Sequence, residues 1–196
     1  MPRTARVLVD QGYYHIVTRG IDCRRLFRYK QDYELFLGIV ATYLNKFKVL
    51  VMNYCLMPNH VHLLMKAEIA SDLPVFMKAI LQVYAAKFRR KYKSAGFVFQ
   101  NRYKSRLIDN DAYLLECARY IERNPVRAKI VVDVTEYPWS SYHYYAKCAA
   151  DKIIALSNPL YLDMADTDIK RREAYASFIH LQRAYDPIVD KALRIA

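Results

Sequence analysis

The sequence predicts an α+β fold: an antiparallel sheet built in the order βαββαβ, with two helices on one face and a helical tail after it. Short segments rich in β-branched and aromatic residues alternate with long segments whose apolar residues recur at helical spacing. The chain has 196 residues, of which 54% are hydrophobic and 14% aromatic, enough for one domain with a substantial core. No internal repeat or flexible linker interrupts it. We therefore expect one domain, with a catalytic or binding unit in residues 1–150 and a helical extension in residues 151–196.

The first half of the predicted sheet contains a strand, a helix and a hairpin. Residues 13–18 combine aromatic and β-branched side chains and predict a strand. Residues 31–46 place apolar side chains at helical spacing and predict a helix. Two further strands are expected over 49–56 and 60–66. Met57-Pro58-Asn59 between them is typical of a turn, so these strands are expected to pair as a hairpin.

The second half begins with a long helix that runs from Ser71-Asp72, a potential N-cap, to about Lys93. A fourth strand is expected within 98–108, where alternation places Arg102, Lys104 and Arg106 on one face. These six elements match the split βαββαβ, ferredoxin-like arrangement, in which both helices cover one face of the sheet.

A third helix is predicted over 111–124, because the residue before Pro125 is disfavoured in helical geometry. From about Val131 onward the pattern indicates a helical tail, with a short helix after Pro138-Trp139-Ser140-Ser141 and another within 168–185.

The net charge of +12 and the isoelectric point near 9.5 favour a polyanionic partner, with nucleic acid first and an anionic membrane second. No apolar run is long enough for a membrane span, and residues 1–6 lack the apolar core of a signal peptide. A cytoplasmic, soluble protein is expected. The four cysteines form no CxxC pair, which favours buried free thiols over a zinc site.

The pair His60-Val61-His62 lies in a predicted strand, so both imidazoles share one face while Val61 points into the core. Two neutral imidazoles on a rigid strand can hold one metal ion. The alternative is two polar residues on the solvent face of a half-buried strand. The pair by itself does not distinguish the two interpretations.

Tyr120 and Asn124 provide a second element, because Tyr113, Cys117, Tyr120 and Asn124 line one stripe of the predicted helix. These side chains could simply pack on the sheet, with Asn124 ending the helix. A functional interpretation is also open. A phenol, with a pKa of about 10, is a weak nucleophile at neutral pH, but it can attack a phosphodiester that a metal ion polarises. His60, His62 and the Asn124 amide oxygen would provide three ligands and leave positions open for phosphate oxygens.

Five segments, in this order, resemble the single-tyrosine HUH transposases, and most closely the branch called REP-associated tyrosine transposases. They span most of residues 13–145, and the ordered set is far more specific than any one of them. The segments are Tyr14-His15-Ile16-Val17-Thr18-Arg19-Gly20, Met57-Pro58-Asn59-His60-Val61-His62, Phe99-Gln100-Asn101-Arg102-Tyr103-Lys104-Ser105, Arg119-Tyr120-Ile121-Glu122-Arg123-Asn124-Pro125-Val126-Arg127-Ala128 and Pro138-Trp139-Ser140-Ser141.

The resemblance implies that residues 1–150 form an HUH transposase domain in which Tyr120 is the nucleophile and His60, His62 and Asn124 bind the metal, some relatives having Gln at the last position. It implies metal-dependent cleavage of single-stranded DNA, often beside a hairpin, giving a 5′-phosphotyrosine link and a free 3′-hydroxyl that allows rejoining. The implied cofactor is Mg²⁺ or Mn²⁺, and the nitrogen ligands lean towards Mn²⁺. The implied partner is single-stranded or hairpin DNA, and the protein would be a monomer or a homodimer.

Basic residues near the proposed site in sequence are candidates for DNA binding, although for any single one a solvated surface position is the usual role. They are Arg19, Arg24, Arg25, Arg102, Lys104, Arg106, Arg123 and Arg127. His15 is expected to be a strand residue with an ordinary hydrogen bond, not a residue that faces the substrate.

Two other functions remain open. One is a hairpin DNA- or RNA-binding protein that keeps the fold but does not cut. The other is a metal-dependent hydrolase of a small phosphate ester, in which water attacks and Tyr120 is dispensable; the +12 charge disfavours it.

Overall fold

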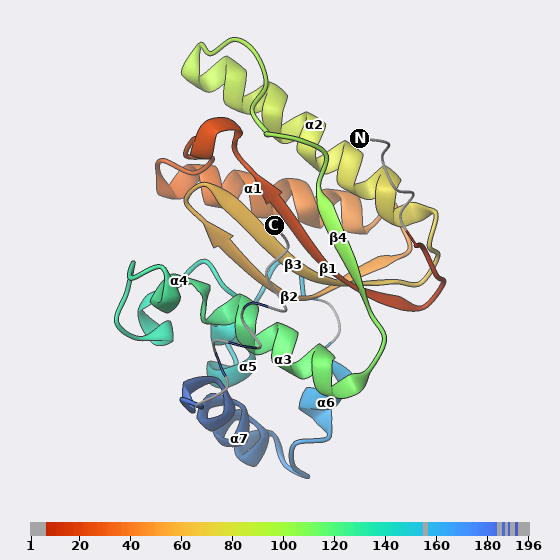
Figure 1. The fold of residues 1–196 in the computed structure, drawn as a ribbon, viewed down its shortest axis with the longest axis vertical. Coiled ribbons are helices and arrows are strands. Elements are labelled where there is room, and N and C mark those ends of the chain that lie inside the picture. The colour runs from red at the N-terminus through yellow and green to blue at the C-terminus, as the bar shows by residue number, and fades with distance from the viewer. Residues whose placement is uncertain (1–6, 155–156, 184–185, 187, 189–190, 192–196) are drawn as a thin grey trace.

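The computed structural model describes residues 7–154, 157–183, 186, 188 and 191. Its centre is an antiparallel sheet with the strand order β2-β3-β1-β4 (Figure 1). The strands are β1 (Gly12–Arg19), β2 (Val49–Met57), β3 (His60–Ala67) and β4 (Lys104–Ile108). The predicted βαββαβ order and the hairpin of β2 and β3 are confirmed.

The sheet is covered on both faces. Helices α1 (Lys30–Leu44) and α2 (Asp72–Tyr92) pack on one face, as predicted, and α3 (Asp111–Glu122) lies across the other (Figure 1). Neighbouring residues of β3 show the division, because Leu63 belongs to the core under α1 and α2 while Leu64 belongs to the core under α3. The sheet is therefore a rigid platform with a second buried face.

A buried carboxylate joins the start of α1 to the end of α2. Asp32 is 1% exposed, and its Oδ2 accepts hydrogen bonds from the Arg28 and Tyr29 N–H groups at 2.8 and 3.0 Å. The Tyr92 hydroxyl donates to the same oxygen at 2.6 Å, and Lys91 Nζ lies 2.5 Å from Oδ1. Asp32 thus caps α1 and fixes α2 against it.

Three local predictions differ from the structure. The predicted strand within 98–108 begins only at Lys104, because the ladder with β1 ends at the pair Val17↔Lys104; Arg102 precedes the strand. Ser71 makes no capping hydrogen bond, because its own backbone is helical (φ −66°, ψ −21°) and not extended as at an N-cap. The Asp72 carboxylate accepts a hydrogen bond from the Lys48 N–H.

The helix predicted to reach Asn124 ends at Glu122. A separate turn, α4 (Asn124–Arg127), follows it with Pro125 in its first turn. Proline cannot donate the next helical hydrogen bond, which explains the break.

The predicted helical tail is present, and its elements are η2 (Val134–Glu136), α5 (Tyr142–Lys147), α6 (Pro159–Leu162) and α7 (Asp168–His180). A short turn η1 (Ile21–Cys23) follows β1. The tail packs on β2 and α3, where the buried Glu122 accepts hydrogen bonds from Asn53 and Ser141 at 3.0 and 2.5 Å. Tyr175 of α7 accepts one from Asn53 at 3.2 Å. All four cysteines are free thiols; Cys55 and Cys117 are buried as expected, whereas Cys23 and Cys148 are exposed. Within the described ranges, no helix combines the length and apolar character that a membrane crossing needs.

Candidate active site

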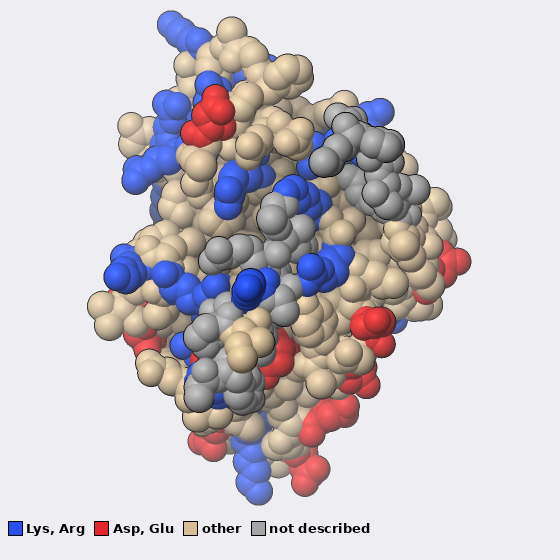
Figure 2. Space-filling model, in the orientation of Figure 1, with Lys and Arg blue, Asp and Glu red and all other residues tan. Residues whose placement is uncertain are grey.

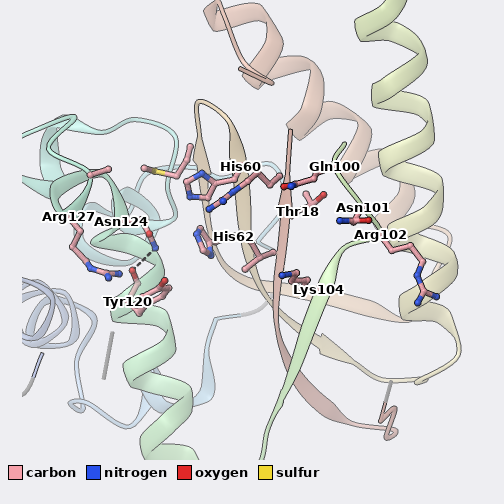
Figure 3. Close-up of a pocket in the computed structure, with 14 residues that line it drawn as sticks. Thr18, His60, His62, Gln100, Asn101, Arg102, Lys104, Tyr120, Asn124 and Arg127 are labelled. Carbon is pink, nitrogen blue, oxygen red and sulfur yellow. Dashed lines mark hydrogen bonds between the residues drawn. The ribbon is translucent and has the colours of Figure 1, made fainter. Parts of the chain in front are cut away.

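A cavity of about 500 Å³ opens beside the beginning of β3, between the sheet, α3 and the segment before β4 (Figure 3). It brings together all four residues proposed for chemistry and four of the basic residues proposed for DNA binding. Its lining residues are Val17, Thr18, Arg19, Met57, His60, His62, Gln100, Asn101, Arg102, Lys104, Tyr120, Asn124, Arg127 and Ala128.

The histidine pair comes from β3, whose alternation places both rings on the α3 face of the sheet. The ring centroids of His60 and His62 are 4.9 Å apart. The Nδ1 of His60 lies 2.7 Å from the Asn59 amide oxygen, which can only accept, so His60 donates from Nδ1 and its lone pair is on Nε2. His62 is 5% exposed, so the pair is not two solvated side chains on an open face.

Both rings are neutral at physiological pH. Burial, followed by the positive charge of Arg19, lowers the pKa of His60 to about 4. Burial also lowers the pKa of His62 well below its usual value, and the neighbouring His15, His60 and Arg127 act in the same direction. A neutral imidazole is the form that binds a metal ion.

His15 has a larger role than the sequence indicated. It is fully buried on β1, and its Nε2 lies 3.0 Å from Nδ1 of His62 on the neighbouring strand. The hydrogen bond uses one ring nitrogen of His62 and leaves Nε2 for the cavity. Hydrogen bonds of this kind fix the orientation of metal-binding histidines. His15 was predicted to make an ordinary hydrogen bond, but its sequence position did not reveal that the partner is a proposed ligand.

We expect His15→Phe to weaken binding of Mn²⁺ about 10- to 100-fold, because the ring of His62 loses its hydrogen bond while the packing space stays filled. His15→Gln, which keeps a donor and an acceptor, should recover part of the affinity. Calorimetric titration with Mn²⁺ measures both variants. His143→Phe, on α5 outside the cavity, is the matched control and should bind like the wild type. Unchanged affinity of His15→Phe would show that His15 does not position His62.

Tyr120 lies on the opposite wall of the cavity from the strands. Its ring centroid is 5.8 Å from that of His62 and 5.7 Å from that of His15. The guanidinium carbon of Arg127 lies 4.5 Å from the centre of the Tyr120 ring. A cation at this position can stabilise negative charge that develops on a phosphate near the tyrosine.

Asn124 is oriented by the end of α3. Its Nδ2 donates to the carbonyl oxygens of Tyr120 and Ile121 at 2.8 and 3.3 Å (Figure 3). Both amide protons are therefore directed to the backbone, and Oδ1 is the atom left for another partner. The break in the helix at Pro125 thus places an amide oxygen one turn from the tyrosine.

The donor set of two neutral imidazoles and one amide oxygen fits a divalent cation with open positions. Among the described residues, no group of three or more His, Cys, Asp or Glu side chains is arranged to hold a metal ion. Metal binding here would therefore depend on Asn124 completing the histidine pair.

Four of the predicted DNA-binding residues lie outside the cavity lining: Arg24, Arg25, Arg106 and Arg123. Arg106 donates to the Tyr113 hydroxyl at 3.0 Å. Arg123 donates to the Leu181 carbonyl oxygen at 2.9 Å and lies 3.5 Å from Asp186, so its guanidinium holds the tail against α3. Local sequence does not reveal this contact, because the partners are about sixty residues away.

Three polar residues of the cavity were not among the predicted site residues: Thr18, Gln100 and Asn101. The signal was present, since all three lie inside segments that carry the family resemblance. Single amide and hydroxyl side chains are too common on protein surfaces to be singled out without the structure.

The chain is similar to known transposases. A family model described as "Transposase IS200 like" matches residues 8–124. A Haemophilus influenzae protein, provisionally named a REP-associated tyrosine transposase, is 32% identical over 100 aligned residues, covering 45% of this chain. The match spans only 56% of that relative's length. A solved structure of a REP-associated tyrosine transposase bound to a REP hairpin has a TM-score of 0.66 and 17% identity, covering 80% of this chain and 92% of that one. That structure shares the fold.

Proposed function

Because this chain belongs to the IS200-like transposase family, we propose that it is a metal-dependent endonuclease and strand transferase acting on single-stranded DNA at hairpin-associated sites. The observation that carries the proposal is the meeting of Tyr120 with His60, His62 and Asn124 in one cavity, from elements far apart in sequence. The alternative of a small-ester hydrolase gives no role to Tyr120 or to the basic residues around it.

The proposed reaction is a displacement at phosphorus. The Tyr120 hydroxyl oxygen forms a bond to the scissile phosphate, and the bond from phosphorus to the 3′-oxygen breaks. The tyrosine proton leaves to solvent, and the departing oxygen gains a proton to become a free 3′-hydroxyl. A second 3′-hydroxyl reverses the step and rejoins the DNA. The phosphodiester energy is kept in the 5′-phosphotyrosine link, so no nucleotide cofactor is required.

His60, His62 and the Asn124 oxygen would hold Mg²⁺ or Mn²⁺. When bound, the cation supplies charge stabilisation to the phosphate that the tyrosine attacks. The chain's own contribution is to keep both imidazoles neutral and to fix their orientation through His15 and Asn59. Arg127, above the tyrosine ring, holds a phosphate oxygen on the nucleophile's side.

The charge distribution supports a nucleic-acid substrate. From Leu73 to Ile108 the chain has nine Lys or Arg residues and no Asp or Glu. Figure 2 shows basic side chains over the upper end of α2 and across the middle of the face, with acidic ones gathered along its lower and right edges. At the end of α2, Lys87, Arg89, Arg90 and Lys93 are all exposed. The similar transposase whose structure has been solved is bound to a REP hairpin. We assign the same class of substrate, hairpin or single-stranded DNA, to this chain.

One chain supplies every residue of the cavity, so a monomer is sufficient for the proposed reaction. Residues 151–196 extend the domain of residues 1–150, because Tyr175 and Asp186 contact residues of β2 and α3 directly. The protein would act in the cytoplasm, where chromosomal DNA is accessible.

The test is a denaturing gel of the full-length protein with hairpin oligonucleotides drawn from around its gene, labelled at either end. We expect a covalent adduct with Mn²⁺ or Mg²⁺ and none with EDTA. The 3′-end label should move with the protein, because the tyrosine retains the 5′-phosphate of the downstream fragment. An adduct that carries the 5′-end label would contradict the proposed polarity. Tight hairpin binding with no adduct under any metal would favour the non-cleaving DNA- or RNA-binding protein.

A further inference from the structure

The cavity has a second end, which the proposed chemistry does not use. Figure 3 shows Thr18, Gln100 and Asn101 on the far side of the two histidines from Tyr120. Thr18 belongs to β1, whereas the two amides belong to the segment that precedes β4. Tyr120 and the amides thus flank the proposed metal position from opposite sides.

Backbone contacts fix this segment beside the end of β1. The Gln100 N–H donates to the Arg19 carbonyl oxygen at 2.9 Å, and the Ile21 N–H donates to the Val98 carbonyl oxygen at 3.0 Å. An isolated bridge also pairs Gly20 with Phe99. The amides are therefore held on the sheet at a fixed place relative to the histidines, although no regular strand reaches them.

The polar groups at this end have no partners in the part of the chain that the structure describes. Neither side-chain amide makes a hydrogen bond there, and the Thr18 hydroxyl is buried without one, on a residue 4% exposed. The Thr18 oxygen is inaccessible from the cavity, whereas both amides are exposed on its wall and available to a ligand. Each amide presents a donor next to an acceptor.

We infer that Gln100 and Asn101 bind the edge of one unpaired base of the DNA strand, next to the phosphate that Tyr120 attacks. The inference rests on the proposed function and adds sequence preference to it. Adenine is the expected base, because on two edges its amino group donates beside a ring nitrogen that accepts, the complement of an amide, whereas unpaired cytosine offers this pattern on one edge only. Arg102, exposed next to the amides, has no such pattern and serves the phosphate backbone.

The experiment measures binding separately from cleavage. Tyr120→Phe protein captures hairpin oligonucleotides whose unpaired flanks are randomised, and sequencing of the bound fraction gives the preference at each position. We expect adenine to be enriched about tenfold at one position, and the combined changes Gln100→Ala and Asn101→Ala to abolish that enrichment. These residues are exposed, so the substitutions leave the core intact.

Arg102→Ala is the matched control, since it removes a neighbouring exposed side chain. It should weaken capture of all sequences alike and keep the adenine enrichment. Two results would overturn the inference. One is adenine enrichment that survives in the double alanine variant. The other is no adenine enrichment by the Tyr120→Phe protein, in which both amides are intact. If the wild-type protein forms the tyrosine adduct while capture by Tyr120→Phe shows no base preference, only the inference fails. If base preference is present but no adduct forms with Tyr120 intact, the cleavage proposal fails and the base site stands.

Discussion

Replacement of Tyr120 by Phe is expected to abolish the covalent protein–DNA adduct, because in the proposed reaction the hydroxyl oxygen bonds to phosphorus. The change removes one atom from a residue that is only 6% exposed. The ring keeps its contacts with His15, His62 and Arg127, so the fold, the histidine pair and DNA binding should persist. The adduct assay with Mn²⁺ should show no band above background, whereas hairpin binding by fluorescence anisotropy should change little.

Tyr113→Phe is the matched control for this experiment. Tyr113 lies on the same helix α3 and its hydroxyl accepts a hydrogen bond from Arg106 at 3.0 Å, but it does not line the cavity. The control should form the adduct at the wild-type rate. Metal-dependent cleavage that persists in Tyr120→Phe would contradict the tyrosine mechanism and identify water as the nucleophile.

Replacement of Asp32 by Asn is expected to lower the free energy of unfolding by about 3 kcal/mol at pH 7, the scale for leaving several donors to a buried carboxylate without their acceptor. Asp32 accepts from Lys91 on one oxygen and from three donors on the other. Asparagine replaces one carboxylate oxygen with an NH2 group, which can only donate. In either orientation of the amide, that NH2 group would face hydrogen-bond donors. Thermal melting should show a midpoint about 6–12 °C lower.

The same substitution has a pH signature. Burial raises the pKa of Asp32, but hydrogen bonds from Lys91, Tyr92 and two backbone N–H groups outweigh it, so the pKa is lowered from 3.8. A lowered pKa means that the carboxylate stabilises the fold above its unfolded pKa, and this contribution is lost as the pH falls through the folded value. The difference between wild type and Asp32→Asn should shrink in acid. Glu34→Gln, an exposed carboxylate on the same helix, should match the wild type at every pH. A constant difference would show that packing, not charge, is responsible.

The sequence was sufficient for the order of the sheet elements and for part of the site. Alternation within a strand placed His60 and His62 on one face, and helical spacing aligned Tyr120 with Asn124. These features depend on periodicities of two and about 3.6 residues, which act within one element and can be recognised from residue type alone. The same rule failed at Arg102, because the ladder between β1 and β4 stops at the pair Val17↔Lys104 and leaves Arg102 outside the strand.

Only the tertiary structure decided how these elements meet. The register that pairs Val17 with His62 brings His15 diagonally onto the His62 ring, and the packing of α3 on the sheet brings Tyr120 to the histidines. Nothing in the sequence separates Arg123 from the other basic residues, yet it is hydrogen-bonded to the tail. The bridge between Gly20 and Phe99 places Gln100 and Asn101 at the cavity. Local propensities determine each element, but register and docking depend on many weak contacts between residues distant in sequence, which only the folded chain brings together.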